Sequence, residues 1–147
     1  MSSDDRIRSA TRDINANAAT VFELIAEPAR QPEWDGNDNL AEIVAGARIR
    51  GVGDVFSMRL TNGAVRDNRV TEFEEGRRIA WLPNEPGQPS PGHLWRWEIE
   101  PIDETSVRVT HTYDWTHLDD PVRMERARAT TSERLGASID RLAALVE

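Results

Sequence analysis

The stretch HLWRWEIEPIDETSVRVTHTYDWT, residues 93–116, contains two runs of alternating side chains separated by a short polar turn. Alternation with a period of two is the pattern of a β-strand whose two faces meet different surroundings. In the first run one face carries His93, Trp95, Trp97 and Ile99. In the second run one face carries Val107, Val109, His111, Tyr113 and Trp115. We therefore predict an antiparallel hairpin of two strands, 93–101 and 106–116.

The pairing of these two strands predicts a pocket at one end of the hairpin. Opposite residues of an antiparallel pair share a face, so odd-numbered residues must pair with odd-numbered ones. Trp97 then lies opposite either His111 or Val109, and in both registers the aromatic ends of the strands meet. Such a cluster is typical of a cavity wall, because indole, imidazole and phenol groups keep polar atoms for a ligand. The alternative is an ordinary core in which each indole finds a backbone partner.

The rest of the chain extends the hairpin into a sheet covered by helices. Short strands are predicted at 6–14, 40–46, 54–60, 65–73 and 77–82. Two short helices follow the first strand, one from about Thr20 to Ala26 and, after the break at Pro28, another to about Trp34. From Asp120, a favourable N-cap, apolar residues recur every three or four positions, which predicts one helix at about 121–146, roughly 38 Å long.

This order predicts an α+β fold. A bent antiparallel sheet of seven strands would wrap around one long C-terminal helix, so that both apolar faces are buried. No linker divides the chain, so we expect a single domain over 1–147. The Pro- and Gly-rich stretch PNEPGQPSPG at 83–92 is interpreted either as a stiff surface connection or as a lid over an opening.

Composition excludes several classes of chemistry. The chain has 147 residues, no Cys, and 18 basic residues that are all Arg. Thiol nucleophiles, Cys-ligated zinc and lysine Schiff bases are therefore excluded, and we expect no cofactor. The formal net charge of −8 disfavours a nucleic-acid partner, because phosphates would be repelled. No apolar run is long enough to span a membrane, and the start MSSDDRIRSA lacks the apolar core of a signal peptide, so a cytoplasmic location is expected.

Four local motifs occur in a characteristic order: ATVFELIAEPARQPEW (19–34), GVGDVF (51–56), RVTEFEEGRRIAW (69–81) and the C-terminal helix. Together they resemble the polyketide cyclase/dehydrase branch of the START-related helix-grip superfamily, over nearly the whole chain. The resemblance implies a seven-stranded sheet gripping the last helix, with a hydrophobic cavity between them. Members include aromatase/cyclases and lipid carriers, so the resemblance implies ligand binding without specifying a reaction.

The same resemblance, with His93 added from the aromatic face of the hairpin, implies which residues line the cavity. The predicted ligand-binding residues are Trp34, Phe56, Met58, Asn68, Trp81, His93, Trp95, Trp97, His111, Tyr113, Trp115, Thr131 and Leu135. Val70 and Ala127 are further candidates at matching positions. For Phe56, Met58, Val70 and Leu135, a place in the plain hydrophobic core is the alternative to ligand contact.

Three functions are compatible with this sequence. The first is a carrier or sensor for a hydrophobic molecule, aromatic or polyketide- or lipid-like. The second is a polyketide cyclase/aromatase or dehydratase in which His111 is a base and Tyr113 a donor to an enolate. The third is a co-chaperone-like protein-interaction module. A metal site is not expected, because His93 and His111 lie too far apart along the hairpin and no carboxylate shares their face. The sequence leaves monomer and homodimer open.

Overall fold

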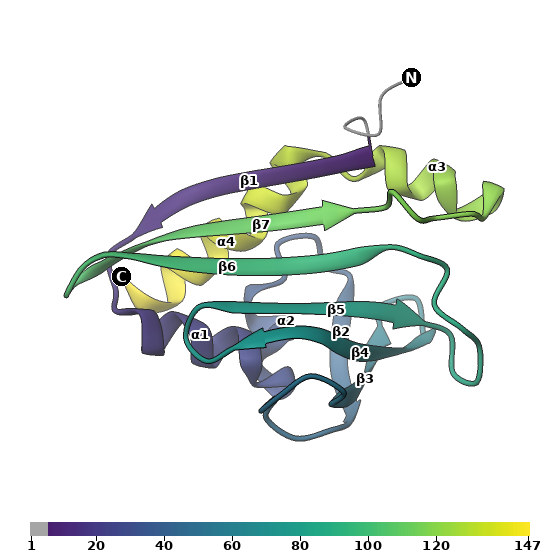
Figure 1. The fold of residues 1–147 in the computed structure, drawn as a ribbon, viewed down its shortest axis with the longest axis horizontal. Coiled ribbons are helices and arrows are strands. Elements are labelled where there is room, and N and C mark those ends of the chain that lie inside the picture. The colour runs from purple at the N-terminus through teal and green to yellow at the C-terminus, as the bar shows by residue number, and fades with distance from the viewer. Residues whose placement is uncertain (1–5) are drawn as a thin grey trace.

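Within residues 6–147, which the computed structural model describes, seven strands form one antiparallel sheet in the order β1-β7-β6-β5-β4-β3-β2 (Figure 1). The strands are β1 (Ile7–Ile14), β2 (Leu40–Ala45), β3 (Val55–Leu60), β4 (Val65–Glu74), β5 (Arg78–Asn84), β6 (Leu94–Asp103) and β7 (Ser106–Asp114). The predicted fold class and seven-stranded sheet are confirmed. Residues 1–5, which form half of the stretch used to argue against a signal peptide, lie outside the described residues.

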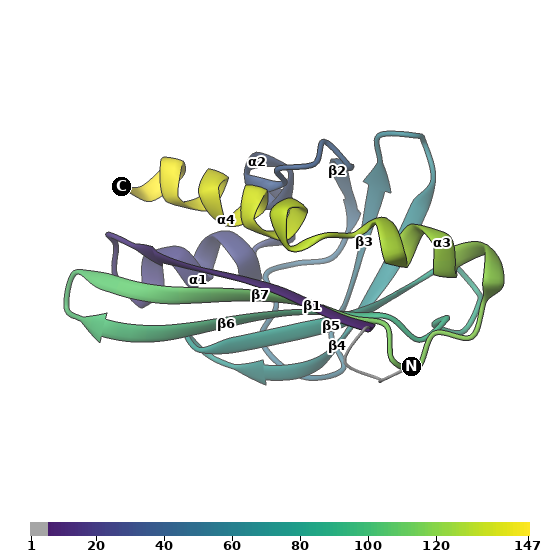
Figure 2. The same ribbon diagram turned by 90° about the horizontal axis from the view of Figure 1, so that it is seen from above.

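The helices lie on one side of the sheet, which bends around them (Figure 2). They are α1 (Ala18–Ala26), the 3₁₀ turn η2 (Pro28–Arg30), α2 (Gln31–Trp34), α3 (Pro121–Ala129) and α4 (Ser132–Val146). Bulges interrupt the pairing of β2 with β3 and of β4 with β5, and such irregularities increase the local bend and twist. In the described part of the chain, no helix is long and apolar enough to cross a membrane.

The two helical segments after β1 end where the sequence predicts, at Ala26 and Trp34, while α1 begins at Ala18, two residues before the predicted start. The Asn17 side chain accepts a hydrogen bond from the Thr20 backbone N–H at 2.8 Å, which caps the start of α1. Pro28, which lacks a backbone N–H, ends that helix and begins the 3₁₀ turn leading to α2. The path directs Trp34 inward, where its indole Nε1 donates to the Leu24 carbonyl at 2.8 Å. This bond ties α2 to α1.

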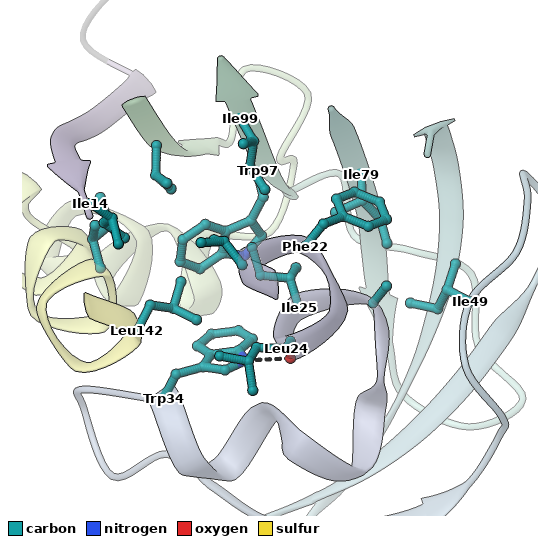
Figure 3. Packing of buried hydrophobic residues seen from close by; sticks show 14 of the residues in the cluster. Ile14, Phe22, Leu24, Ile25, Trp34, Ile49, Ile79, Trp97, Ile99 and Leu142 are labelled. Atoms are coloured by element: carbon teal, nitrogen blue, oxygen red, sulfur yellow. Dashed lines mark hydrogen bonds between the residues drawn. The ribbon is translucent and has the colours of Figure 1, made fainter. Parts of the chain in front are cut away.

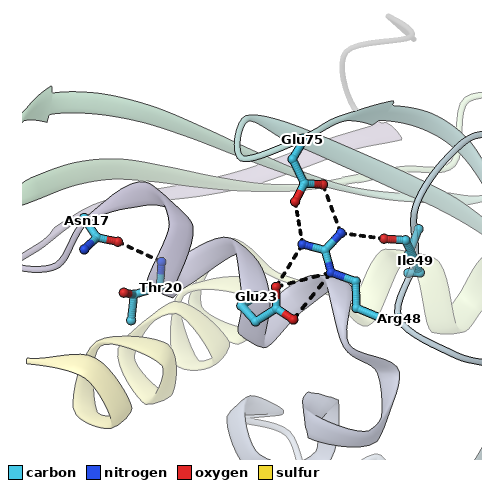
Figure 4. A network of polar contacts seen from close by, with 6 residues as sticks. All are labelled: Asn17, Thr20, Glu23, Arg48, Ile49 and Glu75. Carbon is cyan, nitrogen blue, oxygen red and sulfur yellow. Dashed lines mark hydrogen bonds and ion pairs between the residues drawn. The ribbon is translucent and has the colours of Figure 1, made fainter.

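An arginine on the β2–β3 connection holds α1 against the sheet (Figure 4). The Arg48 guanidinium contacts the carboxylate of Glu23 on α1 at 2.8 Å and that of Glu75 in the β4–β5 turn at 2.6 Å. It also donates to the Ile49 carbonyl at 2.7 Å and lies 5.6 Å from the centre of the Phe22 ring. Two charge-assisted contacts and a cation–π contact thus converge on one side chain.

The prediction of one continuous helix at 121–146 is wrong. The helix ends at Ala129, because Thr130 takes an extended ψ of 104° and Thr131 one of 164°. Threonine is a weak helix former, and its hydroxyl competes for backbone groups. Here the Thr131 hydroxyl accepts a hydrogen bond from the Arg134 N–H and starts α4 as its N-cap. The break separates α3, which lies near the far end of β7, from α4, which crosses the sheet (Figure 2).

A hydrophobic core fills the space between α1, α4 and one end of the β6–β7 hairpin (Figure 3). This packed end comprises Ile99, Val107 and Val109 with the facing Ile14 and Leu142, each no more than 3% exposed. Trp97 and Trp34 close the core with an edge-to-face contact between rings 5.1 Å apart. Beyond Trp97, the side chains on this face of the same two strands change from aliphatic to aromatic and polar.

Candidate functional site

A pocket of about 380 Å³ lies between the concave face of the sheet and helices α2, α3 and α4. Its volume is within the usual range for small-molecule sites. All but two of the predicted ligand-binding residues line it: Trp34, Phe56, Met58, Asn68, Trp81, His93, Trp95, Trp97, His111, Tyr113 and Leu135. These residues come from seven elements and their connections, and the fold brings them together around one space. Their contact with a ligand stays a prediction.

Two predicted residues, Trp115 and Thr131, are absent from the pocket lining. The Trp115 ring stays beside that of Tyr113, with centroids 5.4 Å apart, but β7 ends at Asp114 and residues of α3 pack over the position beyond it. Trp115 is instead buried in a satellite cluster with Leu118 and Ala127. Thr131 is exposed as the cap of α4.

The two additional candidates also lie elsewhere. Neither Val70 nor Ala127 lines the pocket; Val70 packs in the main hydrophobic core and Ala127 in the cluster around Trp115. Both are fully buried, at 1% and 0% exposure. Their apolar character is therefore explained by packing.

The hairpin takes one of the two registers left open by the sequence. Trp97 lies opposite His111, and Trp95 lies opposite Tyr113. The Trp97 and His111 rings stack with centroids 3.7 Å apart and planes 10° apart. Trp95 packs against Tyr113 with ring centroids 4.3 Å apart, and His93 approaches Tyr113 edge-on at 5.9 Å. This pocket end, defined by His93, Trp95, His111 and Tyr113, forms a continuous aromatic wall.

Polar atoms of this wall and of the adjoining Trp97 lack protein partners. Among residues 6–147, four buried side-chain polar atoms have no hydrogen bond, and three of them belong to pocket-lining residues: His93 Nδ1, Trp97 Nε1 and His111 Nδ1. Buried polar groups in proteins are nearly always satisfied, so this concentration calls for an explanation. An ordinary core would have given each indole a backbone partner, as Trp34 has. The three atoms are themselves buried below the pocket surface, so they distinguish this end from an ordinary satisfied core without offering hydrogen bonds to a ligand.

Burial keeps the titratable groups of the wall neutral near pH 7. It lowers the pKa of His111 from 6.5 to about 3, against the opposing effect of a hydrogen bond with the Leu135 backbone. Burial, with the nearby charges of Arg123 and Arg66, lowers the pKa of His93 to about 4. Desolvation raises the pKa of Tyr113 to about 12. The wall therefore offers neutral hydrogen-bonding groups.

A polar and cationic rim surrounds the aromatic wall, and sequence reasoning missed it. The additional polar lining residues include Gln31, Asp35, Arg66, Arg123, Arg126, Arg134 and Ser138. Arg66 shares a face of β4 with Asn68, so strand parity could have identified it. For Arg123, Arg126 and Arg134, no local signal existed, because their direction depends on the break between α3 and α4.

Two helical junctions fix the position of the rim. Asp35, at the end of α2, accepts hydrogen bonds from the backbone N–H groups of Asn37, Asn39 and Leu40 at 3.1, 2.6 and 2.7 Å. Gly36 donates to the Ser138 hydroxyl of α4 at 3.1 Å. A Cβ at position 36 would lie 2.4 Å from the Ala137 backbone, so only glycine permits this approach. α2 and α4 are thereby joined beside the pocket.

The described residues offer neither a metal cluster nor a catalytic triad. In the part of the chain that the structure describes, no group of three or more His, Cys, Asp or Glu is placed to hold a metal ion. Ser57 donates to Asp67 at 2.6 Å, and neither side chain lines the pocket. Within the stretch 83–92, β5 continues to Asn84, two residues beyond its predicted end, and Pro83 lines the pocket.

Comparison with known proteins agrees with this architecture. The sequence model of the family described as "Polyketide cyclase / dehydrase and lipid transport" matches residues 8–147. The chain is 30% identical over 116 residues to "Uncharacterized protein Rv0088" of Mycobacterium tuberculosis, which covers 73% of this chain and 46% of that protein. The chain thus spans about half the length of this curated relative.

Solved structures share the fold at low sequence identity. Protein MLL2253 from Mesorhizobium loti superposes with a TM-score of 0.72 at 16% identity, covering 95% of this chain and 96% of that one. The Aha1 dimer from Colwellia psychrerythraea gives a TM-score of 0.68 at 16% identity, with 96% of each chain covered. At this identity the likeness concerns the fold alone.

Proposed function

The chain belongs to the polyketide cyclase/dehydrase and lipid transport family, and on that premise we propose that it is a binding protein for a hydrophobic small molecule. The ligand, aromatic or polyketide- or lipid-like, would occupy the pocket between the sheet and its helices. The observation that carries this proposal is the aromatic wall of β6 and β7, which lines a pocket of about 380 Å³. Such a surface suits a flat apolar body with a few polar substituents.

The chemistry of the wall favours binding over catalysis. A general base works best when its pKa lies near the operating pH, and burial holds that of His111 at about 3. Its ring is also held by the stack on Trp97 at 3.7 Å. Tyr113, with a pKa raised to about 12, remains a hydrogen-bond donor. A cyclase or dehydratase using His111 and Tyr113 is therefore the weaker alternative.

A protein-interaction module receives less support from the surface. The large exposed apolar residues in the described part of the chain are Ile7, Val44, Val52, Val55, Ile102, Val122 and Leu145. Val44, Val52 and Val55 lie around the connection between the paired strands β2 and β3, whereas the other four come from β1, β6, α3 and α4, so most of these residues do not gather in one patch. This distribution leaves the pocket as the better candidate.

A pair of tryptophan variants tests the proposal. Trp95→Leu removes a partly buried indole from the pocket wall, while Trp115→Leu removes a fully buried indole outside the pocket. We expect Trp95→Leu to weaken binding about tenfold, the value of a lost aromatic contact. Trp115→Leu should cost about 2 kcal/mol of unfolding free energy and leave affinity within about twofold.

The measurements are calorimetric titration for affinity and urea unfolding for stability. The probes form a panel of flat aromatic and aliphatic molecules, led by 2-naphthylmethanol and 2-naphthoate. The proposal is abandoned if no member of the panel binds the unmodified protein, or if both variants lose affinity equally. Native mass spectrometry of the purified protein adds a direct search for a bound small molecule.

A further inference from the structure

Four arginines converge on the pocket rim from three elements. Arg66 comes from β4, Arg123 and Arg126 from α3, and Arg134 from α4, and all four line the same pocket. The chain as a whole carries a net charge of −8, so this concentration of positive charge opposes the average. The lining contains one carboxylate, Asp35, which already accepts three backbone hydrogen bonds. Little negative charge remains in the lining to balance the arginines.

The ion pairs of the rim neutralise only one of these arginines. Arg123 contacts Glu85 at 2.6 Å and Asp120 at 3.2 Å. Arg66, Arg126 and Arg134 form no ion pair within residues 6–147. Arg48 shows the contrast, because this partly buried guanidinium is paired with two carboxylates, those of Glu23 and Glu75.

Arg66 is the most constrained of the three uncompensated guanidinium groups. It is partly buried, and its hydrogen bond goes to the neighbouring Val65 carbonyl at 3.1 Å. Burial and the charges of Arg123 and Arg126 lower the pKa of Arg66, against the opposing effect of Glu85, so Arg66 lies close enough to both arginines to be repelled by them. A partly buried guanidinium facing like charges is unfavourable unless an anion joins it.

We propose that the pocket selects hydrophobic ligands that carry an oxyanion, a carboxylate or a phosphate. The anion would be held at the rim by Arg66, Arg126 and Arg134, and the apolar body would lie against Trp95 and Tyr113. This inference rests on the proposed binding function and specifies its ligand class. Guanidinium groups bind such oxyanions through charge-assisted hydrogen bonds, which are about twice as strong as neutral ones.

Matched probes separate the anion from the apolar body. The ligands 2-naphthoate and 2-naphthyl phosphate carry the two oxyanions on the same ring system that 2-naphthylmethanol presents without charge. We expect at least one anion to bind the unmodified protein about tenfold or more tightly than the alcohol, in calorimetric titrations at low salt. The anion that binds more tightly shows whether the site prefers a carboxylate or a phosphate. Raising the salt concentration should reduce the difference, because the rim is partly exposed.

Matched arginine variants test which cations are responsible. Arg66→Gln and Arg126→Gln change rim residues, while Arg69→Gln on β4 and Arg128→Gln on α3 change exposed arginines outside the pocket lining. Each rim variant should remove most of the anion preference, the double variant Arg66→Gln/Arg126→Gln all of it, and each control none. Stability should not fall in the rim variants, because the substitutions relieve repulsion between like charges; urea unfolding checks this.

The outcomes distinguish this inference from the function on which it rests. If the alcohol binds as tightly as both anions, or if the double variant keeps the preference, the anion inference is overturned and ligand binding stands. If none of the three probes binds, and the wider panel also fails, both are overturned. A preference lost equally in Arg69→Gln would also overturn it, because a general effect of net charge would then explain the result.

Discussion

The two ends of the β6–β7 hairpin share a continuous backbone ladder and differ only in their side chains. At the packed end, Ile99 faces Val109, and both are nearly inaccessible. At the pocket end, Trp95 faces Tyr113 with rings 4.3 Å apart, and nearby polar atoms have no partner. One pair of strands thus contributes to stability at one end and presents a candidate binding surface at the other.

The largest expected effect lies at the packed end. Leu142 on α4 has no exposed surface, so Leu142→Ala should cost about 2–5 kcal/mol of unfolding free energy, through lost burial and a cavity. Leu145, 44% exposed on the same helix, is the matched control, and Leu145→Ala should change stability by about 0.5 kcal/mol or less. Urea unfolding measures both. Equal costs at the two positions would contradict the proposed division between the ends.

The next largest effect is a pH dependence of the unfolding free energy, which arises from His111 at the pocket end. The pKa of His111 is about 3 in the folded protein and about 6.5 when unfolded, so the unfolded chain binds more protons between these values. Stability is therefore lost as the pH falls from 6.5 towards 3. From pH 7 to 4.5 we expect His111 to account for a loss of about 2–3 kcal/mol.

His111→Gln should remove that part of the pH dependence, whatever its effect at pH 7. Leu142→Ala provides the contrast, because no titrating group is lost and its unfolding free energy should keep the slope of the unmodified protein. His93, whose pKa is lowered to about 4, leaves a residual slope in the His111 variant. The measurement is a series of urea titrations across this pH range. Parallel curves for the unmodified protein and His111→Gln would contradict the assignment.

Strand periodicity explains how much of this molecule the sequence predicted. A period of two assigns every residue of β6 and β7 to a face, and the requirement for matching faces limited the register to two choices. The choice of Trp97 opposite His111 depended on the turn, where the pairing shifts between Pro101 and Asp103. Local patterns therefore predicted the sheet and most of the wall, because both follow from backbone geometry.

The rim and the helix break followed from interactions that local patterns do not encode. The apolar spacing from Ala127 to Leu142 fits one helix, yet Thr130 and Thr131 interrupt it, and the new direction brings Arg126 and Arg134 to one pocket. Trp115 lies outside the pocket for a similar reason, since Ala127 of α3 packs against it, and strand alternation does not predict where that helix lies. Charged side chains give no periodic signal of their own, because solvent accepts them on any exposed face.

The smallest effect concerns the break itself. Thr131→Ala removes the hydroxyl that accepts the Arg134 N–H at 3.2 Å, and loss of an N-cap costs about 1 kcal/mol of unfolding free energy. Thr131→Ser keeps the cap and is the matched control. Because Thr131 is exposed and outside the pocket lining, both variants should bind 2-naphthoate or 2-naphthylmethanol as the unmodified protein does. A loss of affinity in Thr131→Ala without a loss of stability would instead return Thr131 to the ligand contacts that its sequence position predicts, beside Thr130, which already lines the pocket.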